Sequence, residues 1–391
     1  MKHIIKFLLK HSLIVSIIIA IVFGLGGGLV GEIIARAYFI DSLSGLSLSG
    51  NLDFSSGKYA DQGLVISNPK NVIVQQDAKV DEMINSVGNS LVGIYKKLSP
   101  KKGKQESAKL SNAFQLENFY KINEPSGQGF VLTSDGWIVT SLTLAKNYND
   151  YVVITKDKTV YQIDKAVVDN LTSFSFVHVK ARDLLVRKFA ESQTIKGGSL
   201  AVAVDWQGFG LVSSVIGFSK SASLIKYSDS FYRKLLLSEK LPGGFEGSIV
   251  FNLAGDTLGL VNSRGEIEPI SHLAGAIKSL FKSQTVVRPS LGVNYIDLAE
   301  LAEISNQGGY LQKGVVIYKP EKSLAIKKNS PAEKSGLREG DIIISVDSLE
   351  LNKDNNLNTM VQDHLVGETL NLIISRQGEE REIKVSLEAI N

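Results

Sequence analysis

Short runs of apolar residues, many with alternating polar positions, fill the middle of the chain and predict β-strands. Each run ends near Gly, Asp or Asn, the residues that favour turns between strands. The predicted strands are Gly129–Leu132, Trp137–Thr140, Tyr151–Thr155, Lys165–Val168, Ser173–Lys180, Leu200–Val204, Leu211–Phe218, Ser248–Leu253 and Thr257–Val261. Such closely spaced short strands indicate a mainly β domain, built as a barrel or a sandwich.

Apolar residues at helical spacing occur on both sides of this strand-rich region. Within Val72–Tyr95 the pattern predicts a short helix followed by a strand, and residues 96–126 are polar and predict a long loop. Ile270–Phe281 predicts an amphipathic helix that closes the β-rich domain. From Arg288 to Leu387 strand and helix patterns mix, which indicates a separate α+β unit.

The N-terminus begins with a different pattern. Ser12–Val30 is uncharged and mostly apolar, close to the ~20 residues that span a bilayer as a helix. Three lysines precede it, and this positive-inside bias places the N-terminus in the cytoplasm. We predict a cytoplasmic segment (1–11), a single transmembrane anchor (12–31) and a linker (32–71) in a plasma-membrane protein whose other domains are extracytoplasmic. The alternative is a signal peptide cleaved near Ala35-Arg36-Ala37.

Composition narrows the class of protein. The chain has 391 residues, of which 43% are hydrophobic and 21% charged, enough for two or three folded domains. A net charge of +3 gives no basic surface of the kind that nucleic-acid binders need. The absence of cysteine excludes disulfides and thiol chemistry, and the five histidines show no metal-ligand spacing. We therefore predict no cofactor and no metal.

Three stretches of the β-rich region carry recognisable motifs. They read SGQGFVLTSDGWIVTSLTLAKN from Ser126, DNLTSFSFVHVK from Asp169 and GGFEGSIVFNLAGDTLGL from Gly243. In this order they resemble the HtrA/Deg family, chymotrypsin-like serine proteases with C-terminal PDZ domains. The resemblance covers about Val72–Leu387 and implies a double β-barrel, trypsin-like protease domain over 72–284.

The same resemblance places Thr143 at the family's catalytic histidine, Ser173 at its aspartate and Glu246 at its nucleophilic serine. Thr143 cannot act as a general base, and Ser173 cannot stabilise an imidazolium. Attack by Glu246 on an acyl group would give a mixed anhydride, and no base is expected nearby. We predict an inactive protease homologue, a pseudoprotease with no catalytic residues. The Glu246 carboxylate is expected to accept hydrogen bonds from the backbone donors of the oxyanion hole.

Two relocated catalytic pairs are the alternatives. Ser248 lies two residues beyond Glu246, and its hydroxyl could be activated by His178 or by Glu246 itself. Strand alternation places His178 on the face opposite Ser173, which argues against the first pair.

The most specific motif is NSPAEKSGLREGDIIISVDSLEL, which starts at Asn329 and resembles the PDZ core of bacterial HtrA-like proteins. Ser330 is expected to cap a short helix with Pro331 at its first position. Ile342 and Ile344 should share one face of a strand, with Ile343 on the other. We predict a PDZ domain over 285–391.

A PDZ domain implies a groove for the C-terminus of a peptide. The candidate carboxylate-binding loop presents backbone N–H groups, the next strand pairs with the peptide, and helix Asn356–Leu365 forms the other wall. About half of the four helix residues Leu357, Met360, Val361 and His364 are expected to face the groove, and core packing is the alternative for them. The predicted peptide-binding residues are Ser290, Leu291, Gly292, Val293, Tyr295, Leu357, Met360, Val361 and His364. The expected ligand ends in an apolar residue.

The sequence therefore favours a bacterial, membrane-anchored pseudoprotease that binds peptide C-termini or unfolded polypeptide through its PDZ domain, as a scaffold or sensor in envelope protein quality control. One alternative is an active serine endopeptidase with displaced catalytic residues. The other is an inactive regulatory subunit that co-assembles with an active paralogue. The family resemblance implies a possible homotrimer, and nothing indicates a nucleic-acid partner.

Overall fold

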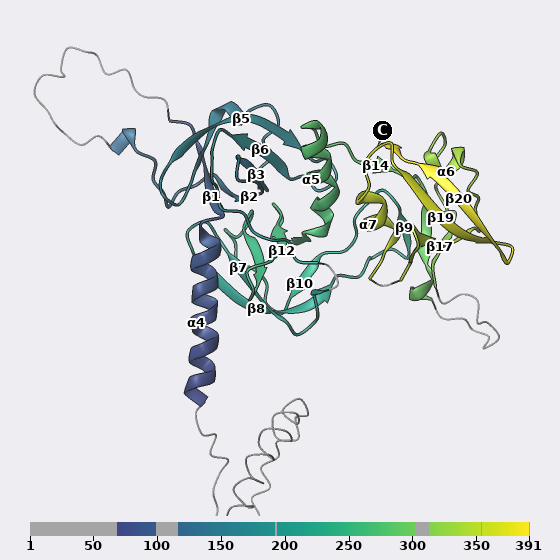
Figure 1. Cartoon of the computed structure of the whole chain (residues 1–391), viewed down its shortest axis with the longest axis horizontal. Helices are drawn as coiled ribbons and strands as arrows, with labels where there is room; N and C mark the ends of the chain where they lie inside the picture. The colour runs from purple at the N-terminus through teal and green to yellow at the C-terminus, as the bar shows by residue number, and fades with distance from the viewer. Residues whose placement is uncertain (1–68, 99–115, 192–193, 302–312, 353, 391) are drawn as a thin grey trace, which may run out of the picture. The chain divides into compact units, whose positions relative to one another are not determined.

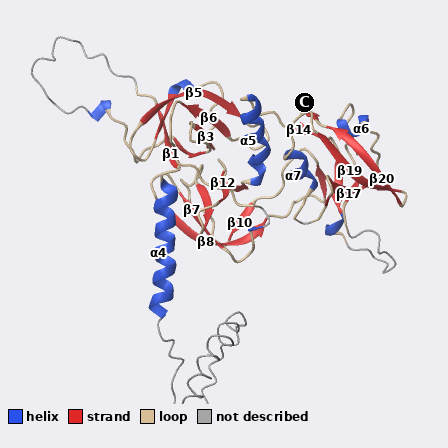
Figure 2. Cartoon of the chain, in the orientation of Figure 1, coloured by secondary structure: helices blue, strands red, loops and turns tan. Residues whose placement is uncertain are grey.

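The computed structural model describes residues 69–98, 116–191, 194–301, 313–352 and 354–390. These residues form mainly strands with few helices, as Figure 2 shows. The predicted cytoplasmic segment (1–11) and transmembrane anchor (12–31) lie outside the described ranges. Within those ranges, no helix combines the length and apolar character needed to cross a bilayer.

Six antiparallel strands close the first barrel in the order β1-β2-β3-β6-β5-β4. The elements are β1 (Leu91–Lys96), η2 (Leu116–Asn118), β2 (Gly127–Val131), β3 (Trp137–Thr140), η3 (Tyr148–Asp150), β4 (Tyr151–Ile154), β5 (Val160–Val168) and β6 (Ser175–Val179). The predicted strands of this region are confirmed. β5 begins earlier than predicted, at Val160, and its first residues alternate between exposed positions and the inward-facing Tyr161 and Ile163, a pattern that the sequence prediction missed.

The second barrel closes in the order β10-β13-β12-β11-β7-β8. Its strands are β7 (Leu200–Val204), β8 (Gly210–Phe218), β10 (Leu235–Leu237), β11 (Ile249–Asn252), β12 (Thr257–Val261) and β13 (Ile267–Pro269). The sequence prediction omitted β10 and β13. Each has three residues, too few for alternation to be visible, and the two pair with each other through Leu235 and Ile267 to close the barrel.

One hydrophobic core joins the two barrels, and each barrel has a further core of its own. The shared core contains Phe130 from the first barrel and Val202 from the second. α4 (Pro69–Gly88) adds Val87, and α5 (Ser271–Ser283) adds Leu273. The predicted helix followed by a strand is confirmed, although the helix is longer than expected. Ile249, the first residue of β11, lies in this shared core directly after the turn at 243–248.

The C-terminal domain is a sheet with the order β20-β19-β17-β16-β15-β9 and its own core. Its elements are β14 (Pro289–Ser290), β15 (Asn294–Asp297), η5 (Leu298–Glu300), β16 (Val315–Ile317), α6 (Pro331–Lys334), β17 (Ile342–Val346), β18 (Leu349–Glu350), α7 (Leu357–Gln362), β19 (Thr369–Arg376), β20 (Glu379–Ser386) and β21 (Glu388–Ala389). The Ser330 hydroxyl accepts from the Glu333 N–H at 3.3 Å, which confirms the predicted cap. Ile343 is buried and Ile342 is half-buried, as alternation predicts.

β9 (Ile225–Tyr227) is the unexpected strand of this sheet. In the chain it lies between β8 and β10 of the second barrel, yet it pairs antiparallel with β15 at the edge of the C-terminal sheet. Figure 1 shows it in teal-green beside the yellow-green strands of that domain. No strand was predicted here, since a three-residue strand without a sequence-local partner gives no pattern.

Candidate functional site

The turn before β11 carries the residues of the predicted nucleophile position. Gly244 and Gly247 have φ angles of 97° and 83°, in the left-handed region that favours glycine. A Cβ on Gly247 would lie 2.9 Å from the Gln128 carbonyl oxygen. The Gln128 side-chain amide donates to the Glu246 carbonyl at 3.0 Å. The turn therefore approaches the first barrel so closely that glycine is required.

Glu246 is exposed, and its carboxylate folds back over this turn. The Gly244 N–H donates to Glu246 Oε2 at 2.9 Å. In the resemblance, backbone N–H groups of this turn would form the oxyanion hole. The carboxylate thus accepts from one of these N–H groups, which is the contact that the sequence predicted for it.

A cavity of about 280 Å³ lies beside the turn. It is lined by Pro125, Ser126, Gly127, Gln128, Ser141, Leu142, Asp205, Trp206, Gln207, Gly244, Glu246 and Ser263. None of these lining residues is a histidine. Thr143 follows Leu142 but is exposed and does not line the cavity.

Ser173 occupies an exposed tight turn and also does not line this cavity. Its φ is 65°, and its N–H donates to the Asp169 carbonyl at 2.7 Å. The neighbouring Ser175 is buried, and its hydroxyl accepts from the Leu144 N–H at 2.9 Å. A backbone-to-hydroxyl contact therefore joins the two segments that hold the predicted histidine and aspartate positions.

Neither relocated catalytic pair is formed among the described residues. Ser248 is fully buried, and its Oγ has no hydrogen-bond partner there. His178 lies on β6, with its Nδ1 2.7 Å from Asp164 Oδ1. A nucleophile needs a base within hydrogen-bond reach, and neither His178 nor the Glu246 carboxylate contacts Ser248 in this way.

The predicted carboxylate-binding loop of the C-terminal domain already holds a carboxylate. The backbone N–H groups of Leu291 and Gly292 donate to Asp229 Oδ1 at 2.9 and 3.2 Å. The Ser290 hydroxyl donates to Asp229 Oδ2 at 2.5 Å. Ser228 adds its hydroxyl, which accepts from the Val293 N–H at 3.1 Å. Sequence reasoning predicted the loop as a ligand site, which stays a prediction, and missed Asp229 and Ser228.

The predicted helix wall is present as α7, with different roles for its residues. Leu357 and Val361 are fully buried in the core of the domain, and Met360 packs against that core. His364 bonds to the Met360 carbonyl through Nδ1 at 2.8 Å and lies 3.0 Å from Asp347 through Nε2. The residue that reaches across to the Asp229 segment is Asn358, whose amide donates to the Ser230 carbonyl at 2.6 Å. Sequence reasoning missed Asn358, which gave no signal as a polar residue in a short helix.

A buried ion pair joins the barrels to the start of the C-terminal domain. The Arg288 guanidinium donates to both oxygens of Asp169, at 3.0 and 2.6 Å, and to the His272 carbonyl at 2.8 Å. Asp169 is fully buried. A Cβ on Gly275 of α5 would lie 1.8 Å from the Gln362 carbonyl oxygen of α7. The two domains are therefore in contact through positions that tolerate little change.

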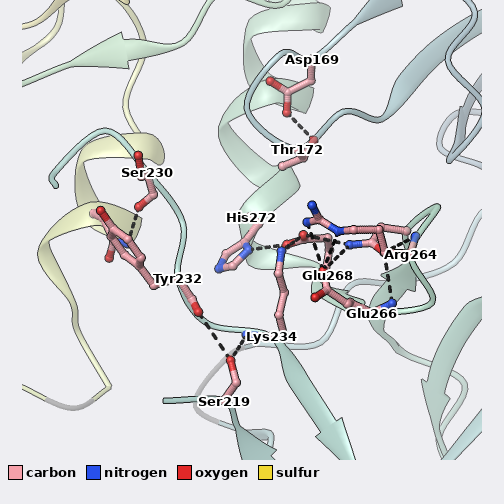
Figure 3. Close-up of polar contacts among 12 residues, drawn as sticks. Asp169, Thr172, Ser219, Ser230, Tyr232, Lys234, Arg264, Glu266, Glu268 and His272 are labelled. Atoms are coloured by element: carbon pink, nitrogen blue, oxygen red, sulfur yellow. Dashed lines mark hydrogen bonds and ion pairs between the residues drawn. The ribbon is translucent and has the colours of Figure 1, made fainter. Parts of the chain in front are cut away.

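The segment that carries Asp229 also packs against α5. The Phe231 ring stacks on the His272 ring with centroids 3.8 Å apart. Glu268 pairs with His272 at 2.9 Å and with Lys234, as Figure 3 shows. Burial first, and then the charges of Lys234 and Arg288, hold the pKa of His272 well below its usual 6.5. This imidazole is therefore neutral and packed, which suits a structural role.

Comparison with known proteins agrees with this arrangement. A protein-family model described as a PDZ domain matches residues 289–387. The chain is similar to a Synechocystis sp. protein named "Putative serine protease HhoB", with 24% identity over 264 residues that make up 64% of this chain and 63% of that protein. It is also similar to a Bartonella henselae protein named "Probable periplasmic serine endoprotease DegP-like", with 27% identity over 303 residues, 70% of this chain and 58% of that protein.

A solved structure titled "HtrA-type protease AlgW with tripeptide" covers 80% of this chain and 97% of its own, with 15% identity and a TM-score of 0.53. At this identity the match concerns the fold alone. The chain spans less than two thirds of the length of the two curated relatives.

Proposed function

Because this chain belongs to the HtrA/DegP-like family of serine proteases, with a chymotrypsin-like fold and a C-terminal PDZ domain, we propose that it is a member that binds polypeptide without cleaving it. In this proposal the barrels are a scaffold and the PDZ groove is the working site. The protein would act as a scaffold or sensor for misfolded polypeptide in the cell envelope, held to the membrane by residues 12–31. The relatives named DegP-like are periplasmic by name, which supports an extracytoplasmic location.

The observation that carries the proposal is the bond from the Gly244 N–H to the Glu246 carboxylate. A negative charge at the oxyanion position repels a developing oxyanion and occupies a donor that would stabilise it. The residues that line the cavity beside it include no imidazole to activate a hydroxyl, which supports a cleft without triad chemistry. Loss of nucleophile or base costs on the order of 10⁶ in rate in well-studied serine proteases.

The test uses the full-length chain, an unfolded protein substrate and a fluorophosphonate probe. We expect no cleavage and no covalent labelling, equal to a Glu246→Ala, Ser248→Ala double variant. Cleavage and labelling that disappear in the double variant would contradict the proposal and assign catalysis to Ser248. A circular dichroism melt of each sample shows that an inert protein is folded.

A further inference from the structure

The segment 225–230 lies in the PDZ groove in the manner of a bound peptide. Its strand β9 runs antiparallel to β15, with Ile225 opposite Ile296 and Tyr227 opposite Asn294. The Ser228 N–H donates to the Val293 carbonyl at 2.9 Å. The segment therefore runs toward the carboxylate-binding loop, as a peptide does when it adds a strand to a PDZ sheet.

Asp229 supplies the negative charge at the end of this strand. Its carboxylate accepts from Ser290, Leu291 and Gly292, and also from the Ser228 hydroxyl at 2.7 Å. Asp229 is 4% exposed and Ser228 is fully buried. Because the chain continues beyond Asp229, this side-chain carboxylate stands where the terminal carboxylate of a peptide would bind.

On these contacts we propose that segment 225–230 is an intramolecular competitor that closes the PDZ groove, and that a polypeptide with a free C-terminal carboxylate binds by displacing it. This inference rests on the proposed peptide-binding function and specifies how that site is regulated. The donors of the loop are used fully in the closed state, so an incoming carboxylate must replace Asp229 to bind. A tethered ligand acts at an effective concentration of about millimolar for a short flexible connection, which weakens the apparent affinity of any free peptide.

The segment is held mainly by polar contacts, which makes displacement feasible. All three residues of β9 are half-buried, and the core of the C-terminal domain contains no residue from the segment. A cavity of about 640 Å³ flanks it, lined by Lys226 and Tyr232 from the barrel side and by Tyr295 and Asn358 from the PDZ side. An apolar C-terminal residue would contribute contacts that the segment does not make.

Segment 225–230 lies in the connection between β8 and β10, residues 219–234. The two ends of this connection are bonded to each other, and the segment lies between them. The Ser219 N–H donates to the Lys234 carbonyl at 2.8 Å, and the Lys234 N–H donates to the Ser219 hydroxyl at 2.8 Å. Figure 3 shows these residues beside Tyr232. The connection can therefore leave the groove as one unit without opening the second barrel.

A reversible disulfide tests the inference because the natural chain has no cysteine. The pair Ile225→Cys, Ile296→Cys joins opposed positions of β9 and β15. The Asn294 N–H and carbonyl bond to Ala325 and Tyr318, away from β9. By alternation the pair 225–296 is also of the non-hydrogen-bonded type, whose side chains are closest and suit a disulfide.

Binding is measured on the full-length chain by fluorescence anisotropy. The probe is a labelled pool of decapeptides with an apolar last residue and a free carboxylate, and the control pool is amidated at the C-terminus. We expect Asp229→Asn to bind the free-carboxylate pool about tenfold more tightly than wild type, since the competing state loses charge-assisted bonds. Asp164→Asn, a carboxylate of the first barrel that contacts His178, serves as the matched control and should leave the affinity unchanged.

The oxidised double-cysteine variant should bind no peptide, and reduction should restore wild-type binding. If the oxidised and reduced forms bind the pool equally, the competitor inference is wrong while peptide binding stands. If the disulfide forms and no protein, including Asp229→Asn, binds either pool, then the proposed peptide-binding function itself is wrong, and its regulation with it.

Discussion

The nucleophile turn and the carboxylate-binding loop hold the same chemical arrangement with opposite consequences. In each, backbone N–H groups that could bind a ligand oxygen donate to a carboxylate of the chain itself: one donates to Glu246 at the turn, and two donate to Asp229 at the loop. Glu246 lies two residues from its donor and is exposed. Asp229 comes from another domain and is buried. A local substitution changes the site permanently, whereas occupation by a distant segment is reversible.

The second difference lies in what remains when the carboxylate leaves. Under the proposed function, Thr143 and Ser173, at the positions that the family resemblance gives to the histidine and the aspartate, supply neither base nor acid, so emptying the nucleophile turn would restore no protease chemistry. Around the carboxylate-binding loop, the donors of Leu291, Gly292 and Val293 are all intact. Under the proposed function, an emptied loop is therefore ready to bind a peptide.

The largest expected effect comes from the ion pair that holds the domains together. Arg288→Met leaves Asp169 buried without its bidentate partner, and unpaired buried charges cost roughly 3–5 kcal/mol of unfolding free energy. Urea unfolding measures this loss. Arg264→Met removes an exposed pair with Glu266 and should cost less than about 1 kcal/mol. Equal losses in the two variants would show that the buried pair between the domains adds no more stability than an exposed one.

Neutralising each carboxylate in turn compares the two sites directly, with a smaller expected effect on the unfolding free energy. Asp229→Asn should lower the unfolding free energy by about 1–3 kcal/mol, because buried donors lose a charged acceptor. The matched change Glu246→Gln is exposed and should stay within about 0.5 kcal/mol. Urea unfolding of both variants gives the comparison. If Glu246→Gln is as destabilised as Asp229→Asn, the distinction between local and remote occupation is lost.

Lowering the pH should reduce the unfolding free energy by about 1 kcal/mol through His272. This imidazole stacks on Phe231, directly after segment 225–230. The folded-state pKa of His272 is depressed below its usual 6.5, so the unfolded chain takes up a proton first as the pH falls. Stability from the neutral imidazole is present above pH 6.5 and is lost below it, by at most about 1.4 kcal/mol per pH unit. Unfolding free energies at pH 7.5 and 5.5 (each about one unit from that value) measure the slope. His272→Gln should flatten it, and an unchanged slope would assign the acid sensitivity elsewhere.

No gain in fluorophosphonate labelling is expected when a serine alone is restored at the nucleophile position. Glu246→Ser supplies a hydroxyl at the turn, but the described residues that line the adjacent cavity include no imidazole to activate it. Labelling by a fluorophosphonate should therefore equal that of Glu246→Ala. Labelling that is specific to Glu246→Ser would reveal a base at the site and contradict the account of the barrel cleft.

Much of the barrel architecture could be predicted because its information is local. β3, β7 and β12 coincide with predicted strands, since each is an apolar run that ends at a turn residue. The Glu246 contact was also predictable, because donor and acceptor lie in one turn. The strands β9, β10 and β13 were missed because three-residue strands depend on partners far along the chain.

The occupation of the PDZ groove could not be predicted from the sequence for the same reason, because its partners are far apart in the chain. Leu291 and Asp229 are 62 residues apart, and neither spacing nor composition links them. The PDZ motif predicted the loop and its donors. It could not predict that the acceptor is already in the chain, because that depends on how two domains dock.

Amide hydrogen exchange followed by mass spectrometry tests the central comparison most directly, on wild type, Asp229→Asn and Glu246→Gln. The account predicts strong protection of residues 290–293 in wild type, faster exchange there in Asp229→Asn, and no change there in Glu246→Gln. The turn at 243–247 should exchange at the same rate in wild type and Asp229→Asn. Equal exchange of residues 290–293 in wild type and Asp229→Asn would contradict the claim that Asp229 closes the groove.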